Sequence, residues 1–194
     1  SDARLSGVMS WYAIEDRTRN LIGLPHWETA PDFIEAVLPQ FRVDMWQNQP
    51  TRVEVWVEKE ALVNTIDRVC RELDVPYMSC RGYMSQSEEW SAGRRIRSYW
   101  RTHRQETIII YLGDHDPSGL DMSRDHVDRL RLFAERPVEV RRIALNYDQI
   151  EQYNPPPNPA KMTDSRAAGY CERFGESSWE LDALSPRVMA QLVR

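Results

Sequence analysis

The stretch TIIIYLGDHDPSG, residues 107–119, decides the fold class of this chain. Its first half, 107–112, is a continuous apolar run rich in β-branched residues, which is typical of a central parallel strand buried on both faces. Its second half changes to glycine, aspartate, proline and serine, which form turns and start helices. In an extended segment Asp114 and Asp116 point to the same side, whereas His115 between them points away.

A second segment, VWVEKEAL at residues 55–62, repeats this order of elements. Residues 52–57 alternate apolar and charged side chains, as a strand does, and end at Glu58, and a 3.6-residue period over 61–73 predicts a helix. In open α/β sheets, ligands bind at the carboxyl ends of the strands. If the two strands are neighbours, Glu58 faces Asp114 and Asp116, and a hard divalent cation cancels the repulsion among the three carboxylates.

Each of these motifs alone is common, since a lone DxD is usually a solvated turn. Their conjunction predicts a Mg²⁺ site, with Mn²⁺ as a substitute, in which Glu58, Asp114 and Asp116 are both the metal ligands and the catalytic residues.

The remaining periodicity completes an alternation of strands and helices. Further strands are expected over 76–80 and 138–145, and further helices over 87–104 and 120–135. Such alternation predicts an α/β domain over 51–146, Rossmann-like, with about four mainly parallel strands flanked by helices. An N-terminal helical extension is expected over 1–50, with helices over 2–19 and 33–46, the second capped by Thr29 or Asp32. A C-terminal helical extension over 147–194 would hold helices over 147–153, 164–174 and 186–193, and 154–159 (NPPPNP) would be a stiff extended connector.

Composition narrows the class of protein. The 194 residues carry a net charge of −5, which argues against a protein that coats nucleic acid with its whole surface but not against a local basic groove. No apolar run approaches the length of roughly 18 residues that a membrane span needs. The three cysteines are odd in number and lack a CxxC spacing, so we expect neither disulfides nor zinc, and a cytoplasmic location, nucleoid-associated if the protein is bacterial or viral.

The basic residues suggest where nucleic acid would bind. Residues 93–104 hold five arginines and two aromatic residues on an expected helix. The alternative is a solvated helix face with Trp100 packed inward. Lys59 flanks the acidic site and Arg81 follows the second expected strand; either could meet a phosphate, with surface side chains as the alternative. The predicted nucleic-acid-binding residues are Lys59, Arg81, Arg94, Arg95, Arg97 and Arg101.

Other polar residues have plainer expectations. Ser118 is expected to cap a helix. Glu180 and Asp182 would add a second metal or orient the ligands, or else belong to a helix or turn face. Four residues are expected to be surface or structural charges: His103, His126, Arg141 and Arg142.

A glutamate after the first strand and a DxD after the third form a pattern that resembles the Toprim domain of topoisomerases, bacterial primases and OLD-type nucleases. VWVEKEAL and YLGDHDPSG most resemble the A subunit of topoisomerase VI and the related meiotic double-strand-break protein. Residues 80–83 (CRGY) resemble a segment that follows the second strand in those proteins, and 178–184 (SWELDAL) resembles the ends of topoisomerase VI-like proteins. The resemblance covers roughly 52–145 and implies a Toprim fold, a metal-dependent DNA-cleaving enzyme, and Glu58 as a general acid or base.

One departure limits what the resemblance implies. The family's nucleophilic tyrosine lies in a winged-helix domain before Toprim, and about 50 residues are too few for that domain. Tyr12 is expected to be a packing residue, and we expect an upstream region that carries the tyrosine. Two alternatives stay open: a tyrosine-independent OLD-like nuclease, and a non-catalytic module that binds metal or DNA. The family implies DNA as partner, with a homodimer and an ATPase subunit by analogy, and no membrane.

Overall fold

The computed structural model describes residues 5–10 and 23–194 and divides the chain into two units, Ser1–Val43 and Asp44–Arg194. Of the helix expected over 2–19 only residues 5–10 are described, and Tyr12 lies outside the described residues. In the first unit, helix α2 (Ala30–Val37) begins at Thr29, which forms a capping box with Asp32.

The helix predicted over 33–46 is therefore wrong in its second half. α2 ends at Val37 and continues only as a single 3₁₀ turn, η2 (Leu38–Gln40). Pro39 lies in that turn, and proline has no N–H to continue an α-helical ladder. Trp46 instead belongs to the second unit, where its indole N–H donates to the carbonyl of Leu73 over 2.9 Å.

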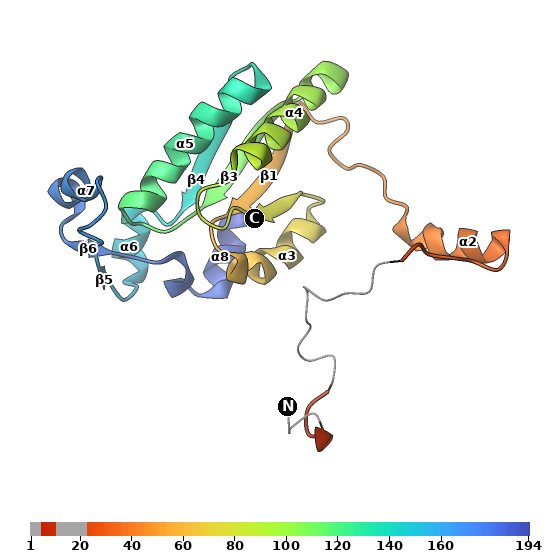
Figure 1. Ribbon diagram of the computed structural model, residues 1–194, viewed down its shortest axis with the longest axis horizontal. Helices are drawn as coiled ribbons and strands as arrows, with labels where there is room; N and C mark the ends of the chain where they lie inside the picture. The colour runs from red at the N-terminus through yellow and green to blue at the C-terminus, as the bar shows by residue number, and fades with distance from the viewer. Residues whose placement is uncertain (1–4, 11–22) are drawn as a thin grey trace. The chain divides into compact units, whose positions relative to one another are not determined.

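The second unit is an α/β domain with a four-stranded, all-parallel sheet, as predicted (Figure 1). Its strands are β1 (Thr51–Val57), β2 (Tyr77–Ser79), β3 (Glu106–Leu112) and β4 (Glu139–Ala144), in the order β2-β1-β3-β4. The two strands that precede the acidic motifs are neighbours, with Val57 opposite Leu112.

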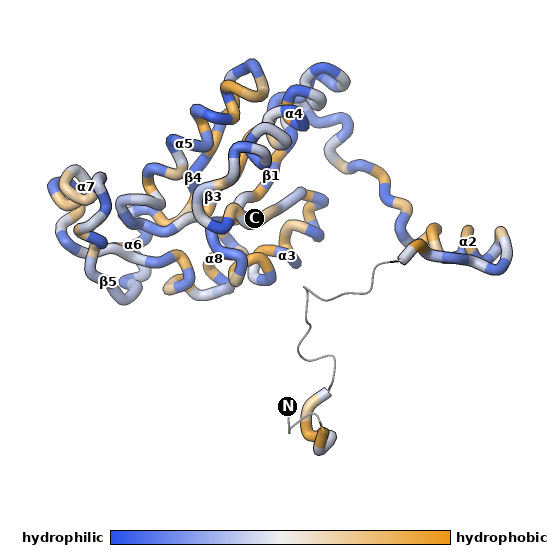
Figure 2. The backbone as a smooth tube through the Cα atoms, viewed as in Figure 1, coloured by the Kyte–Doolittle hydropathy of each residue, from blue (hydrophilic) through white to orange (hydrophobic). Residues whose placement is uncertain are grey.

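Helices cover both faces of this sheet (Figure 1). On one face lie α4 (Gln86–His103) and α5 (Pro117–Ala134); on the other lie η3 (Glu60–Leu62), α3 (Val63–Glu72) and α8 (Pro186–Val193). Side chains of β1 alternate between the faces, since Val55 and Val57 join the core with α3 and α8, whereas Trp56 joins the core with α4 and α5. In Figure 2 polar and apolar residues alternate along α4 and α5, as expected for helices that cover a sheet.

The C-terminal segment returns across the carboxyl edge of the sheet. It comprises α6 (Tyr147–Tyr153), β5 (Asn158–Pro159), α7 (Ala167–Phe174), β6 (Ser177–Ser178) and η4 (Leu181–Ala183). The end of the extended connector pairs with β6 as a short antiparallel ladder, which the sequence did not predict. A two-way backbone bridge joins Trp179 to His115, so this segment is fixed to the loop that carries the aspartates.

Candidate functional site

The sheet brings the predicted acids to one edge. Because Val57 and Leu112 are opposite each other, Glu58 and Gly113 leave the sheet side by side. The amide of Glu58 donates to the carbonyl of Leu112 over 2.8 Å, which extends the β1–β3 ladder by one bond. The acidic segments that follow β1 and β3 therefore meet at the carboxyl end of the sheet, where α/β proteins bind their ligands.

Glu58 and Asp114 are both buried and directly connected. The amide of Asp114 donates to Oε2 of Glu58 over 2.8 Å. Burial, and then the charge of Asp114, raise the pKa of Glu58. Gly113 makes the approach possible, because a Cβ at this position would come within 2.8 Å of Oε2 of Glu58 and 2.7 Å of the Tyr111 ring.

Asp114 connects the sheet edge to the C-terminal segment. Its Oδ1 accepts a 2.7 Å hydrogen bond from the amide of Leu181, and its Oδ2 lies 3.4 Å from Nζ of Lys59. Burial raises the pKa of Asp114, and the bond from Leu181 and the charge of Lys59 oppose that effect. Lys59 also pairs with Glu180 at 2.8 Å and with Asp182 at 3.2 Å. The carboxylates of these two C-terminal acids therefore face the ammonium group of Lys59 and not the acids of the sheet edge.

Asp116 has a capping role that was predicted for a different residue. It is the N-cap of α5, and its Oδ1 accepts from the amide of Gly119 at 2.6 Å and from the hydroxyl of Ser118 at 3.0 Å. The prediction that Ser118 caps this helix is therefore wrong, because the cap begins two residues earlier. The other carboxylate oxygen of Asp116 is not used by this cap.

His115 points away from the acids, as the extended backbone predicted. It is buried among aromatic rings, and its Nδ1 lies 2.9 Å from the hydroxyl of Tyr170. The rings packed around it are Tyr147, Tyr170, Phe174 and Trp179. Burial lowers the pKa of His115 to about 4, with the charge of Arg142 as a second cause.

Arg142 contacts the loop that carries Asp114 and Asp116, and is a candidate for positioning these acids. The sequence predicted only a structural or rim charge at this position. Its guanidinium donates to the carbonyls of Gly113 at 2.8 Å and Gly119 at 3.0 Å, and also to that of Asp114. Its charge also lies near Glu58, whose pKa it lowers against the larger effect of burial. The one sequence signal for a buried Arg142 was its position inside the strand expected over 138–145.

The donor chemistry of this edge fits magnesium, but the side chains do not form a closed ligand set as they are positioned. Three carboxylates supply the hard oxygen donors that Mg²⁺ prefers. Among residues 5–10 and 23–194, however, no three His, Cys, Asp or Glu side chains are grouped closely enough to hold a metal ion. One oxygen of each acid is already occupied, by the amides of Asp114, Leu181 and Gly119 respectively.

The predicted nucleic-acid-binding arginines divide into two groups. Arg81 pairs with Glu60 at 2.9 Å, and Arg95 makes two 2.8 Å bonds to the buried Glu54. Three arginines lie instead on an exposed side of α4 and line one groove: Arg94, Arg97 and Arg101.

One histidine was placed wrongly by the sequence. His126, expected at the surface, is buried, and its Nδ1 lies 2.6 Å from Oε1 of Glu89. The helical periods of α4 and α5 place His126 and Glu89 on inward faces. Their pairing could not be predicted from a local sequence motif, because the two residues are 37 positions apart. His103 is exposed, as predicted.

Comparisons of the chain with protein-family models, with curated proteins and with solved structures found no match. Within the part of the chain that the structure describes, no helix is long and apolar enough to cross a membrane.

Proposed function

We propose that the edge formed by Glu58, Asp114 and Asp116 is a magnesium-dependent centre acting on DNA phosphodiester bonds, in a Toprim module of the topoisomerase VI A-subunit type. The observation that carries this proposal is the burial of two acids, Glu58 and Asp114, at the carboxyl ends of neighbouring strands, where the amide of Asp114 donates to the Glu58 carboxylate. Burying acids side by side costs free energy. Acids with perturbed pKa values are concentrated at functional sites, so the cost is best explained by a ligand.

Each residue at this edge has a separate role in the proposed reaction. The three carboxylates would hold the ion, which when bound stabilises negative charge on a phosphate and lowers the pKa of a coordinated water. Glu58, whose pKa is raised by burial, is the acid placed to accept or return a proton. Lys59, partly exposed beside Asp114, can donate to a phosphate oxygen. Arg142 fixes the loop that carries both aspartates.

A second candidate function is a non-catalytic binding module. The observation that favours it is the use of one oxygen of every acid in a backbone hydrogen bond, together with the pairing of Lys59 to Asp114. In that case the acids serve mainly to fix the loop and the C-terminal segment. A tyrosine-independent nuclease is the third candidate, and it would use the same acids as the first.

The test combines calorimetry and DNA cleavage. Titration with Mg²⁺ and with Mn²⁺ should give a binding isotherm for the native chain and none for Glu58→Gln or Asp114→Asn, which both keep an oxygen acceptor while losing the charge. Glu151→Gln, an exposed acid on α6, is the matched control and should bind metal normally.

Nicking of supercoiled plasmid separates the candidates. Metal-dependent nicking by this chain, lost in both variants, identifies the tyrosine-independent nuclease. Metal uptake with no nicking by this chain, but with cleavage once a tyrosine-bearing domain is supplied, identifies the topoisomerase-like module. Metal uptake without cleavage in either case identifies the binding module, and no metal uptake contradicts the proposal.

A further inference from the structure

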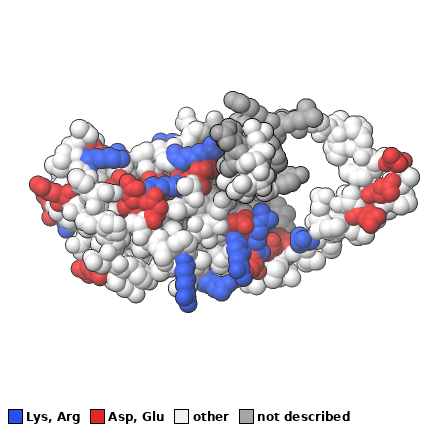
Figure 3. Space-filling view, turned by 90° about the horizontal axis from the view of Figure 1, so that it is seen from below, with Lys and Arg blue, Asp and Glu red and all other residues white. Residues whose placement is uncertain are grey.

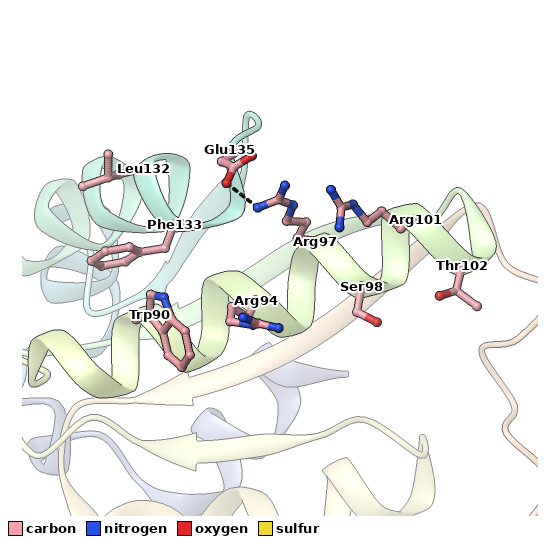
Figure 4. A pocket seen from close by; sticks show the side chains of 9 residues that line it. All are labelled: Trp90, Arg94, Arg97, Ser98, Arg101, Thr102, Leu132, Phe133 and Glu135. Carbon is pink, nitrogen blue, oxygen red and sulfur yellow. Dashed lines mark hydrogen bonds and ion pairs between the residues drawn. The ribbon is translucent and has the colours of Figure 1, made fainter.

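A groove lies between α4 and α5, on the sheet face opposite α3 and α8 (Figure 4). Its volume is about 720 Å³. The residues that line it are Trp90, Arg94, Arg97, Ser98, Arg101, Thr102, Leu132, Phe133 and Glu135. None of the three acids at the sheet edge is among them, so the groove is separate from the proposed metal centre.

Three guanidinium groups follow the groove along α4. Arg94, Arg97 and Arg101 recur at helical spacing and extend over roughly 10 Å of the helix axis. Glu135 pairs with Arg97, as the dashed line in Figure 4 marks, whereas no carboxylate of the described residues pairs with Arg94 or Arg101. The lining therefore has an excess of positive charge, although the whole chain carries −5.

The pairing of Arg94 and Arg101 differs from that of Arg95 on the same helix. On the face drawn in Figure 3, basic side chains gather at the lower centre, with a few acidic side chains among them. Arg95, on another side of the same helix, is neutralised by the buried Glu54. Within the described residues, Arg94 and Arg101 thus lack a carboxylate partner of the kind that Arg95 has, which suits them to an external anion.

Aromatic and hydroxyl groups complete the groove. Trp90 is 49% exposed, and the guanidinium of Arg94 lies over its ring at 5.1 Å from the centroid. Phe133 lines the groove from α5, and Ser98 and Thr102 line it from α4 (Figure 4). Exposed aromatic rings beside arginines stack unpaired bases, while arginine and hydroxyl groups contact phosphates.

We propose that this groove binds single-stranded nucleic acid, with Trp90 stacked on a base and with Arg94, Arg97 and Arg101 on consecutive phosphates. A duplex fits the lining less well, because paired bases offer no free face to Trp90. The proposal goes beyond the acidic edge and needs no metal ion.

The test measures fluorescence anisotropy with labelled oligothymidine of about 20 nucleotides, oligouridine of the same length, and a matched duplex, all in EDTA. We expect oligothymidine to bind with a log–log salt slope of about −2, that is roughly −0.7 for each of three phosphates. Arg94→Ala/Arg101→Ala should weaken binding at least tenfold and reduce the slope by about 1.4. Trp90→Ala should weaken binding roughly tenfold at an unchanged slope, and Trp90→Phe should keep most of the affinity.

Two controls keep the proposal separable from folding and from the metal centre. Arg68→Ala/Arg187→Ala removes the same charge from α3 and α8 on the other sheet face and should bind normally. Glu58→Gln should also bind normally, whatever it does to cleavage. Circular dichroism and thermal melting check that each variant is folded.

The proposal is overturned if neither oligothymidine nor oligouridine binds, or if the duplex binds as tightly as the single strands. It is also overturned if Arg68→Ala/Arg187→Ala loses as much affinity as Arg94→Ala/Arg101→Ala, or if folded Trp90→Ala keeps the native affinity. Binding of either single strand supports it, and the ratio of the two affinities identifies the preferred sugar.

Discussion

The amide of Asp114 donates to Oε2 of Glu58 over 2.8 Å. This bond joins the residue that follows β1 to the loop that follows β3, and so holds the two acids close together. This contact depends on the register of β1 and β3, in which Val57 and Leu112 are opposite each other. A shift of one residue would turn the alternating side chains of β1 to the wrong faces of the sheet, so core packing protects the geometry of the site.

Substitution of Asp116 separates its capping role from its charge. Asp116→Ala removes the acceptor for the amide of Gly119 and should lower the free energy of unfolding by about 1 kcal/mol. Asp116→Asn keeps an oxygen at that position and should stay close to native stability while losing metal affinity. Urea unfolding and calorimetry measure the two effects. Equal destabilisation by Asn and Ala would mean that the charge, and not the cap, stabilises the helix.

Two glycine-to-alanine substitutions should have opposite effects on stability. A Cβ at Gly93 would come within 2.8 Å of the backbone of Phe133 and 2.9 Å of that of Ala134, so Gly93→Ala should separate α4 from α5 at a cost of about 1–3 kcal/mol. Gly169, in α7, has open space around its Cβ position, and Gly169→Ala should stabilise the protein by roughly 0.5–1 kcal/mol. Thermal unfolding of both variants measures the difference, and a stable Gly93→Ala would contradict the close helix contact.

Arg95→Ala should destabilise the protein rather than specifically weaken its binding of nucleic acid. It leaves Glu54, 2% exposed, without its cationic partner. Breaking a fully buried ion pair costs about 3–5 kcal/mol, and because the side chain of Arg95 is 38% exposed we expect a cost at or below about 3 kcal/mol. Arg94→Ala, one position earlier and exposed, is the matched control and should change stability by less than about 0.5 kcal/mol. Denaturant unfolding checks both values. A fully stable Arg95→Ala with reduced nucleic-acid affinity would return Arg95 to the binding surface.

His115 should make stability depend on pH in the acidic range. Burial lowers its pKa from 6.5 to about 4, so between these values the unfolded chain binds a proton that the folded protein does not. The contribution of His115 to the free energy of unfolding is therefore fully present above pH 6.5. It falls with decreasing pH down to about pH 4, by at most about 3 kcal/mol.

The pH dependence is measured against a variant that cannot titrate. His115→Asn should unfold with a shallower dependence on pH over this window than the native chain. Identical profiles for native and His115→Asn would show that the ring is accessible to protons in the folded state.

The sheet and the placement of the acids were predictable because they depend on local patterns. The apolar run 107–112 and the alternation of 52–57 fix two buried strands, and both acidic motifs directly follow them. The adjacency of these strands was a condition of the prediction, and the structure confirms it.

What the sequence did not predict depends on contacts between distant residues. The burial of His126 requires Glu89 on another helix, and the role of Arg142 requires carbonyls that a bend of the backbone brings together only in the folded loop. The capping of α5 by Asp116 differs from the predicted cap by only two residues, yet it gives one acid a structural task that competes with metal binding. The helix predicted over 33–46 stops early because Pro39 cannot continue the α-helical hydrogen bonds, which the apolar period does not reveal.

The bond from Leu181 to Asp114 sets an order of events during biosynthesis. The donor lies 67 positions after its acceptor, so the ribosome must finish the sheet, and then most of the tail, before the amide exists. A nascent chain can thus fold its strands while Asp114 and Lys59 still face water. The acidic edge therefore gains this hydrogen-bond donor only after all four strands of the sheet and the tail up to Leu181 have been synthesised.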